Sequence, residues 1–304
     1  NVTGWAAAGA RRSSEANSLA NLTVSNSGTG AGTTYRFDNT RKDSVDTGEV
    51  GLRGKLQTGS VGHEWVLVAS HFSAEKKNAY AMDFGNTQAT NLYQPVYSAL
   101  PAFSANTLRG GDLADPRRTG STRLSSFALG DTMSLLDGRL LLTAGLRHQT
   151  MEIAKYAYGT AVQTDRYDQS RTSPLLAAVY KLDKGFSLYG NYVEGLSQGQ
   201  TAPSTAANRG EMLSPYVAKQ KEMGVKFDGG RFGGSVALFS TTKPRAYVGS
   251  DNIFRSNGRD RHQGIELAVQ GEATRGLRLL GGLTWLDAKQ INTGAASTDG
   301  RRVI

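Results

Sequence analysis

The chain alternates between short glycine-containing turns and long polar segments along most of its length, with apolar stretches between them. Four short turns contain Gly138, Gly185, Gly229 and Gly276, which follow one another at intervals of 47, 44 and 47 residues. Each interval has room for a strand, a long connection and a returning strand. This regular alternation predicts antiparallel strands that run up and down between two kinds of connection.

The stretches between the turns show the alternation of apolar and polar residues that is typical of two-faced strands. Val50 and Leu52 fall on one face of such a strand, and Glu49 and Arg53 fall on the other. The same period recurs in two later stretches, around positions 225 and 267. If the apolar face meets lipid, the polar face must line a lumen. The residues that we therefore expect to face the lumen are Glu222, Lys226, Glu266 and Gln270.

The absence of a long apolar run decides how this chain can cross a membrane. A spanning helix needs about 20 apolar residues in succession, and the longest runs here have about four. Only a closed barrel can otherwise satisfy the backbone inside a bilayer. We predict an all-β fold, an antiparallel transmembrane β-barrel of the outer-membrane type. About eleven strands are expected, near Leu19–Asn26, Val45–Gln57, Val61–Lys77, Thr122–Leu135, Arg139–Ala154, Thr172–Leu182, Phe186–Leu196, Val217–Asp228, Phe232–Arg245, Arg259–Glu272 and Leu277–Lys289.

The longer connections are expected on the opposite side from the short turns. In a barrel of this type the short turns face the periplasm and the long loops face outward. Four stretches qualify as long loops, from Asn78 to Ser121, Lys155 to Arg171, Ser197 to Ser214 and Ala246 to Gly258.

Several function classes find no support in the residues. The net charge is +9, but the basic residues form no run longer than two, which argues against nucleic-acid binding. The chain has no cysteine, and its four histidines lie far apart without carboxylates at metal-ligand spacing. No phosphate-binding loop or hydrolase motif is present. We predict that the protein is not an enzyme and has no metal site and no covalently bound cofactor.

An ordered series of motifs carries a family resemblance. Its segments are FSLYGNYVEGL (Phe186–Leu196), LSPYVAKQKEMGVK (Leu213–Lys226), ALFSTTKP (Ala237–Pro244), GRDRHQGIEL (Gly258–Leu267) and GLRLLGGLTWLDA (Gly276–Ala288), with DGRLLLTAGLRHQ (Asp137–Gln149) further upstream. In this order and spacing the sequence resembles the TonB-dependent siderophore receptor family, from about Asp43 to Ile304. The resemblance is strongest after Phe186.

The resemblance implies a bacterial outer-membrane location and a barrel of about 22 strands closed around an N-terminal plug. Residues 1–304 would form part of that barrel, without the plug, its TonB box or the C-terminal strands. The implied function is import of a ferric siderophore, the transported ligand. The implied partners are outer-membrane lipid and a TonB-type energising complex that acts through the plug. The alternatives are a passive pore, a haem or cobalamin receptor, or a soluble basic β-protein that binds polyanions.

Ligand recognition would then belong to the outer loops. Ferric siderophores are polar, often aromatic and commonly anionic chelates. Aromatic and arginine side chains can hold such ligands by stacking, hydrogen bonding and charge. Alternatively, the same aromatics would form the girdle at the membrane interface. The loop candidates are Tyr93, Tyr97, Phe103, Tyr156, Tyr158, Arg245, Tyr247 and Phe254.

Overall fold

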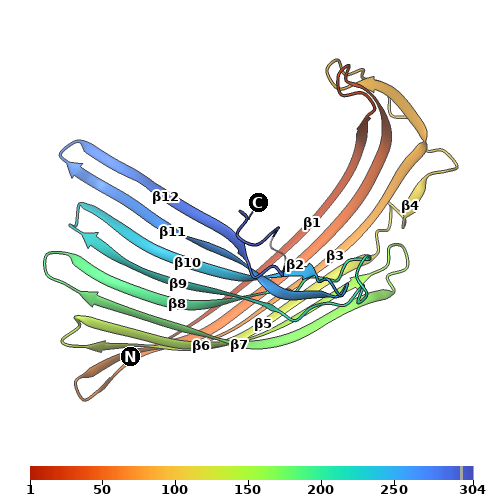
Figure 1. The fold of residues 1–304 in the computed structure, drawn as a ribbon. Coiled ribbons are helices and arrows are strands. Elements are labelled where there is room, and N and C mark those ends of the chain that lie inside the picture. Colours follow the sequence, from red (N-terminus) through yellow and green to blue (C-terminus); the bar gives the residue numbers. More distant parts are fainter. Residues whose placement is uncertain (295–296, 304) are drawn as a thin grey trace.

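The computed structural model of the chain describes residues 1–294 and 297–303, which form one curved antiparallel sheet shaped like a trough (Figure 1). Its strands pair in sequence order, except that the short β4 adds to β3. They are β1 (Val2–Val24), β2 (Ala31–Thr58), β3 (Val61–Asn91), β4 (Leu108–Gly110), β5 (Arg118–Leu135), β6 (Leu140–Tyr156), β7 (Gln163–Lys181), β8 (Phe186–Ser197), β9 (Tyr216–Asp228), β10 (Phe232–Val248), β11 (Phe254–Thr274) and β12 (Leu277–Ile291). No helix long and apolar enough to span a membrane occurs in the described part of the chain. The all-β, antiparallel prediction is confirmed.

The register separates an apolar face from a polar face, because directly opposed residues of antiparallel strands lie on the same side of the sheet. Leu67 of β3 opposes Leu129 of β5, which opposes Leu146 of β6. At the other end of the sheet, Ile265 of β11 opposes Trp285 of β12. These side chains are 44–64% exposed, apart from the partly buried Leu67, and contribute to an apolar surface. We call this side the outer face.

The opposite side, the inner face, carries the polar residues that the alternation singled out. The ladders of β9, β10 and β11 place Glu222, Lys226, Glu266 and Gln270 together on it. The Tyr189 hydroxyl of β8 donates a hydrogen bond to Glu222 Oε1 at 2.7 Å. The Lys226 ammonium lies 4.6 Å from the centre of the Tyr189 ring. Neighbouring strands therefore tie their polar side chains together across this face.

The connections separate as the sequence predicted. The short turns lie at one end of the sheet, at the left of Figure 1, and the longer connections lie at the other end. Gly138, Gly185 and Gly276 have φ values of 82°, 81° and 84°, which are costly for residues with a Cβ atom. In the turn after Asp228 the positive φ falls on Gly230, not on Gly229.

The predicted lengths of the first three strands were wrong. The first begins at Val2 instead of near Leu19, and β2 and β3 run well beyond the predicted Val45–Gln57 and Val61–Lys77. Apolar alternation marks only the part of a strand that meets lipid, whereas the hydrogen-bond ladder continues past it. The polar ends are held by cross-strand pairs, such as Arg12 with Asp46 at 2.8 Å. The loop expected from Asn78 onward therefore begins only after β3 ends, and β4 was missed.

A comparison of Gly→Ala substitutions at Gly185 and Gly276 can separate the cost of a strained backbone conformation from the cost of a steric clash. Both have positive φ, but a Cβ atom at Gly185 would lie 2.2 Å from the Asp228 carbonyl oxygen, whereas one at Gly276 would meet nothing within 4 Å. We expect Gly276→Ala to cost about 1–2 kcal/mol from its backbone conformation alone. Gly185→Ala should cost more, because the turn must also move. Thermal unfolding of the two variants in detergent checks the order, and equal losses would contradict it.

Candidate ligand-binding face

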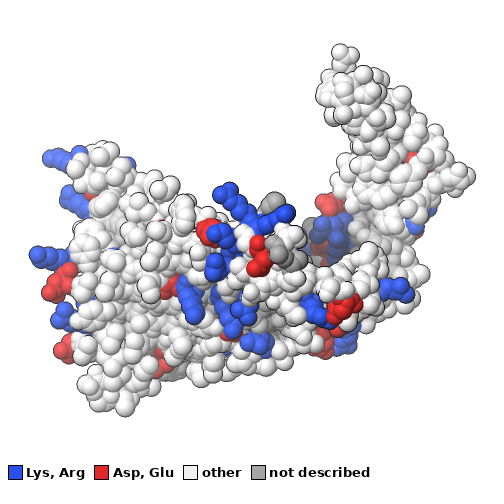
Figure 2. Space-filling model, viewed as in Figure 1, with Lys and Arg blue, Asp and Glu red and all other residues white. Residues whose placement is uncertain are grey.

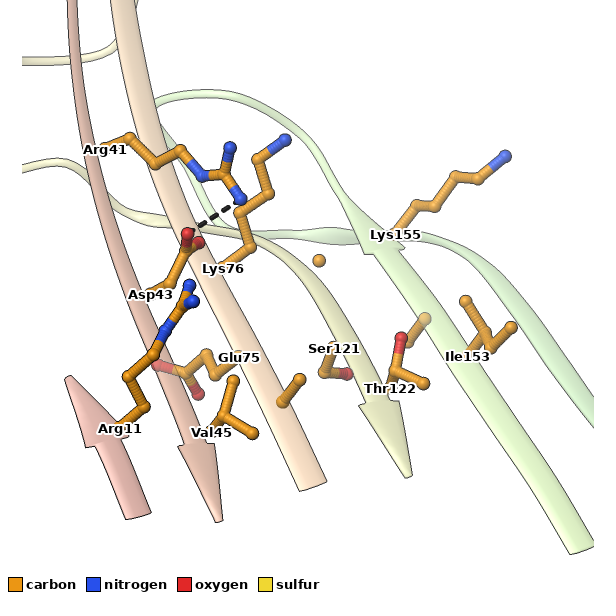
Figure 3. A pocket seen from close by; sticks show the side chains of 13 residues that line it. Arg11, Arg41, Asp43, Val45, Glu75, Lys76, Ser121, Thr122, Ile153 and Lys155 are labelled. Carbon is orange, nitrogen blue, oxygen red and sulfur yellow. Dashed lines mark ion pairs between the residues drawn. The ribbon is translucent and has the colours of Figure 1, made fainter. Parts of the chain in front are cut away.

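Basic side chains gather inside the trough, toward the end with the long connections (Figure 2). There the inner face holds a hollow of about 270 Å³ between β1, β2, β3, β5 and β6. Figure 3 shows its lining, in which the Arg41 guanidinium contacts Asp43 at 2.7 Å. Its lining residues are Arg11, Arg41, Asp43, Val45, Ala74, Glu75, Lys76, Gly120, Ser121, Thr122, Ile153, Ala154 and Lys155.

Positive charge exceeds negative charge in this hollow. Four cations line it and only two carboxylates do, one of which, Glu75, belongs to the outer face by register. Lys155 Nζ lies 3.8 Å from Asp165, and Lys76 has no carboxylate within ion-pair distance among the described residues. A concave surface with excess positive charge attracts anions and raises their local concentration. The inner face at this end is therefore suited to an anionic ligand.

The connection from 198 to 215, between β8 and β9, is packed against the β10–β11 connection. Phe254 is 8% exposed and forms a small apolar cluster with Ala202 and Ala206. Leu213 and Ala246 pack against the same cluster. Few side chains elsewhere in the described residues are fully buried. A large part of the buried apolar side chains therefore anchors a loop at the end of the sheet that carries the long connections.

One asparagine completes the junction between these two connections. Asn208 Oδ1 accepts a hydrogen bond from the Phe254 backbone N–H at 2.8 Å, and its Nδ2 donates to the Phe254 carbonyl at 2.9 Å. The Ala207 N–H donates to the Asn252 carbonyl at 2.8 Å. The Asn208 side chain thus acts as one rung of a strand ladder, and the two connections form a single unit.

The tip of the β10–β11 connection is held by a charged pair. The Arg255 guanidinium donates to Asp251 Oδ2 at 2.6 Å, and the Ile253 N–H donates to Asp251 Oδ1 at 3.2 Å. Hydrogen bonding from Arg255, then from the Ile253 backbone, lowers the pKa of Asp251 below its usual value. The turn is consequently stabilised above the ordinary aspartate pKa and loses this contribution as the pH falls through the lowered value.

The connection between β3 and β5 is pinned by a buried carboxylate. Asp83 is fully buried and accepts hydrogen bonds from the Ser104 hydroxyl at 2.5 Å and from the Ser104 N–H at 2.6 Å. Two guanidinium groups lie over the Phe103 ring, that of Arg36 4.1 Å and that of Arg109 5.1 Å from its centre. The connection is therefore folded onto the upper part of β2 and β3 rather than lying free.

The predicted loop residues fall into three groups: the tyrosines of the β3–β5 connection, two residues at the end of β10, and a set of residues engaged in packing. Tyr97, at 93% exposed, projects from the β3–β5 connection, whereas Tyr93, at 61%, donates its hydroxyl to the Ser27 carbonyl at 2.5 Å. Arg245 lies on the inner face and pairs with Asp260 at 3.0 Å. Tyr247 lies beside Gly258 in the next rungs of the same ladder.

The remaining candidates are engaged in packing. Tyr158 packs edge-on against Tyr80, with ring centres 5.0 Å apart. Tyr156 lies on the outer face beneath Arg118, away from the trough. Phe103 and Phe254 are held in the contacts described above. The structure thus brings Arg245 and Tyr247 together and leaves the tyrosines of the β3–β5 connection apart from them.

Sequence reasoning missed the cations of the hollow, because Arg11, Arg41 and Lys76 lie in segments expected to be unstructured or at strand ends. The available signal was local: Arg41 and Asp43 stand two residues apart, so they share one face of a strand, and Asp43 opposes Lys76 on the neighbouring strand. Within the described residues no group of three or more His, Asp or Glu side chains is placed to hold a metal ion.

An antiparallel sheet with a continuous apolar face, a polar concave face, short turns at one end and long connections at the other is the wall of an outer-membrane β-barrel. The family model described as TonB dependent receptor-like, beta-barrel matches residues 1–303. The chain belongs to this family of outer-membrane receptors, which are not enzymes.

The relatives of the chain include siderophore receptors. It is 33% identical over 269 residues to the ferrichrome receptor FcuA of Yersinia enterocolitica, a match that covers 86% of this chain and 34% of FcuA. Among solved structures, BauA, the ferric preacinetobactin receptor from Acinetobacter baumannii, superposes with a TM-score of 0.81 at 30% identity, over 100% of this chain and 45% of BauA. The siderophore receptor PiuA of the same species has the same fold, with a TM-score of 0.74 at 19% identity over 99% of this chain and 46% of PiuA. The chain spans less than half the length of each.

We expect the junction between the two connections to depend on the Asn208 amide. Asn208→Ala removes both hydrogen bonds to Phe254, each worth about 1 kcal/mol, and should raise the rate of proteolytic cleavage within 198–215 about tenfold or more. Asn208→Asp keeps the acceptor but replaces the donor that also serves Glu211, at 2.8 Å, with a second carboxylate, so it should show an increase at least as large. The exposed Asn106→Ala is the matched control. If all three variants are cleaved at the rate of the unchanged protein, this junction does not hold the loop.

Proposed function

We propose that the chain forms part of the barrel of an outer-membrane receptor that captures a ferric siderophore at its outer end. The barrel would close with further strands to about 22 and surround a plug. In the whole receptor, a TonB-type energising complex would act on that plug and release the chelate inward. The receptors FcuA and BauA, whose names specify ferric-chelate ligands, support this proposal through their similarity to the chain.

The observation that supports an anionic ligand is the excess of positive charge on the inner face beside the long connections. Arg11, Arg41, Lys76 and Lys155 line the hollow there. Arg245 and Tyr247 lie near the end of β10 that joins its long connection, and supply a guanidinium and an aromatic ring. Charge, hydrogen bonding and stacking together suit an anionic, partly aromatic chelate. We propose that Tyr93 and Tyr97, which are exposed on the β3–β5 connection, also contact the chelate.

The decisive experiment is uptake of radiolabelled iron by cells that carry the complete gene, with and without the energising complex, across a panel of ferric siderophores. We expect uptake of one chelate class that is lost without the complex. Uptake that continues without the complex would indicate a passive pore instead. If no iron chelate enters, but haem or cobalamin does, the receptor serves a different ligand.

The role of the inner-face cations can be tested separately by binding. Lys76→Gln with Lys155→Gln removes two charges from the hollow, and we expect the dissociation constant for the transported anionic chelate to rise about tenfold, since each lost contact of this kind contributes about 0.7 kcal/mol. The effect should shrink at high salt because exposed charges are screened.

The matched control for this double variant is Lys184→Gln with Arg231→Gln. It removes the same charge from the short turns at the other end of the sheet. It should bind the chelate as the unchanged receptor does. Equal weakening by both double variants would show that only the net charge of the protein matters, and that the hollow is not the binding surface.

A further inference from the structure

One polar pair of the sheet faces lipid instead of the lumen. His63 of β3 and Asp131 of β5 approach one another, with His63 Nδ1 2.7 Å from Asp131 Oδ2. Asp131 stands two residues after Leu129, and His63 stands four residues before Leu67, with no register shift between them. Both side chains therefore belong to the outer face. Ionisable residues on a lipid-facing surface are rare and costly, and those that occur usually serve a function.

The surroundings of this pair compensate little of its charge. Apolar side chains flank it on the outer face, with Trp65 opposite Asp131 and Leu56 opposite His63. Among the described residues, no Lys or Arg lies within ion-pair distance of Asp131, and Asp131 Oδ1 has no hydrogen-bond partner. The carboxylate is therefore balanced by a single imidazole, which carries charge only when it is protonated. A ligand that brings a second cation would complete this arrangement.

The pair stands at the depth where phospholipid headgroups meet hydrocarbon. β3 begins at Val61 after a short turn, and β5 ends at Leu135 before the next one, so His63 and Asp131 lie two and four residues from these ends. At about 3.4 Å per residue and a tilt of about 45°, these separations correspond to about 5 and 10 Å along the membrane normal. The headgroup region of a bilayer is about 5–8 Å thick on each side. Because the short turns face the periplasm, the pair belongs to the periplasmic leaflet.

An apolar groove adjoins the pair on the same face. A hollow of about 520 Å³ lies over β5, β6, β7 and β8, and its lining includes Met133, Ala144, Leu176 and Ala178. Ala144 is the residue of β6 that directly opposes Asp131, and Met133 follows Asp131 two positions later on the same face. The groove therefore begins beside the carboxylate. The small side chains of the two alanines leave room in it for an acyl chain.

We propose that this surface binds one phosphatidylethanolamine of the periplasmic leaflet. The lipid ammonium donates to the Asp131 carboxylate, which can accept further hydrogen bonds beside the one from His63. The imidazole uses Nδ1 for Asp131, so that Nε2 of the protonated ring donates to the lipid phosphate. An acyl chain lies in the groove of Ala144 and Ala178. The site is on the opposite side of the sheet from the proposed siderophore surface and does not depend on it.

The test uses the full-length receptor in detergent and measures retained lipid by native mass spectrometry. The probes are phosphatidylethanolamine, phosphatidylcholine, whose methylated nitrogen has no N–H donor, and phosphatidylglycerol, which has no cation, all with the same acyl chains. We expect one phosphatidylethanolamine to bind, with a preference of about tenfold or more over the other two. Asp131→Asn should abolish that preference and leave the fold intact, because it removes a charge from a lipid-facing surface. The matched control is Glu64→Gln, which removes a carboxylate from the opposite face of β3 and should leave the preference unchanged.

A second variant tests the groove. Ala144 and Ala178 are exposed on the outer face, so Ala144→Leu with Ala178→Leu fills the hollow without crowding the sheet. It should weaken the binding of phosphatidylethanolamine and phosphatidylcholine about equally. An undiminished preference in the Asp131→Asn variant would overturn the proposal. So would equal retention of phosphatidylethanolamine and phosphatidylcholine, which would indicate an unselective lipid layer, or displacement of the lipid by free ethanolamine at equal concentration, which would indicate a site for the amine alone.

Discussion

The ladder of backbone hydrogen bonds is the constraint on which the rest of this structure depends. Inside hydrocarbon, an N–H or C=O group without a partner costs several kcal/mol, about as much as the net stability of many domains. The sheet meets this demand by pairing every long strand with its neighbour in sequence order. Side chains are then free to differ on the two faces, apolar toward lipid and polar toward the lumen, without any conventional core.

The same ladder explains how the outer end is built. β1, β2 and β3 continue past the apolar band as a wall that stands above the rest of the sheet (Figure 1). That extension brings Arg41 and Lys76 to the inner face and Lys42 and Lys77 to the outer face, from adjacent positions in the chain. Because successive residues point to opposite sides, one polar stretch places cations on both faces of the sheet, and those of the inner face belong to the proposed siderophore surface.

The loops at this end are anchored in two different ways. Phe254 and Asn208 join the connections on either side of β9 and β10 through apolar packing and a ladder-like pair of hydrogen bonds. Asp83 holds the β3–β5 connection through Ser104. Anchored loops present their exposed residues, such as Tyr97, in a defined place. Such preorganisation reduces the entropy that a bound chelate must overcome.

The sequence by itself determined the strand pattern within the membrane, the two faces and the turns, because each rests on local rules. Alternation assigned Glu222 and Glu266 to the polar face, and glycine marked the turns. The sequence also carried the family, through motifs after Phe186. What only the tertiary structure decided was where polar strands end and which side chains meet. Arg11, Arg41 and Lys76 come from distant segments, and Phe254 is packed against Ala202 and Ala206 of another connection. The register between strands decides which side chains come into contact. Polar strand ends have no alternation of apolar residues from which that register could be predicted.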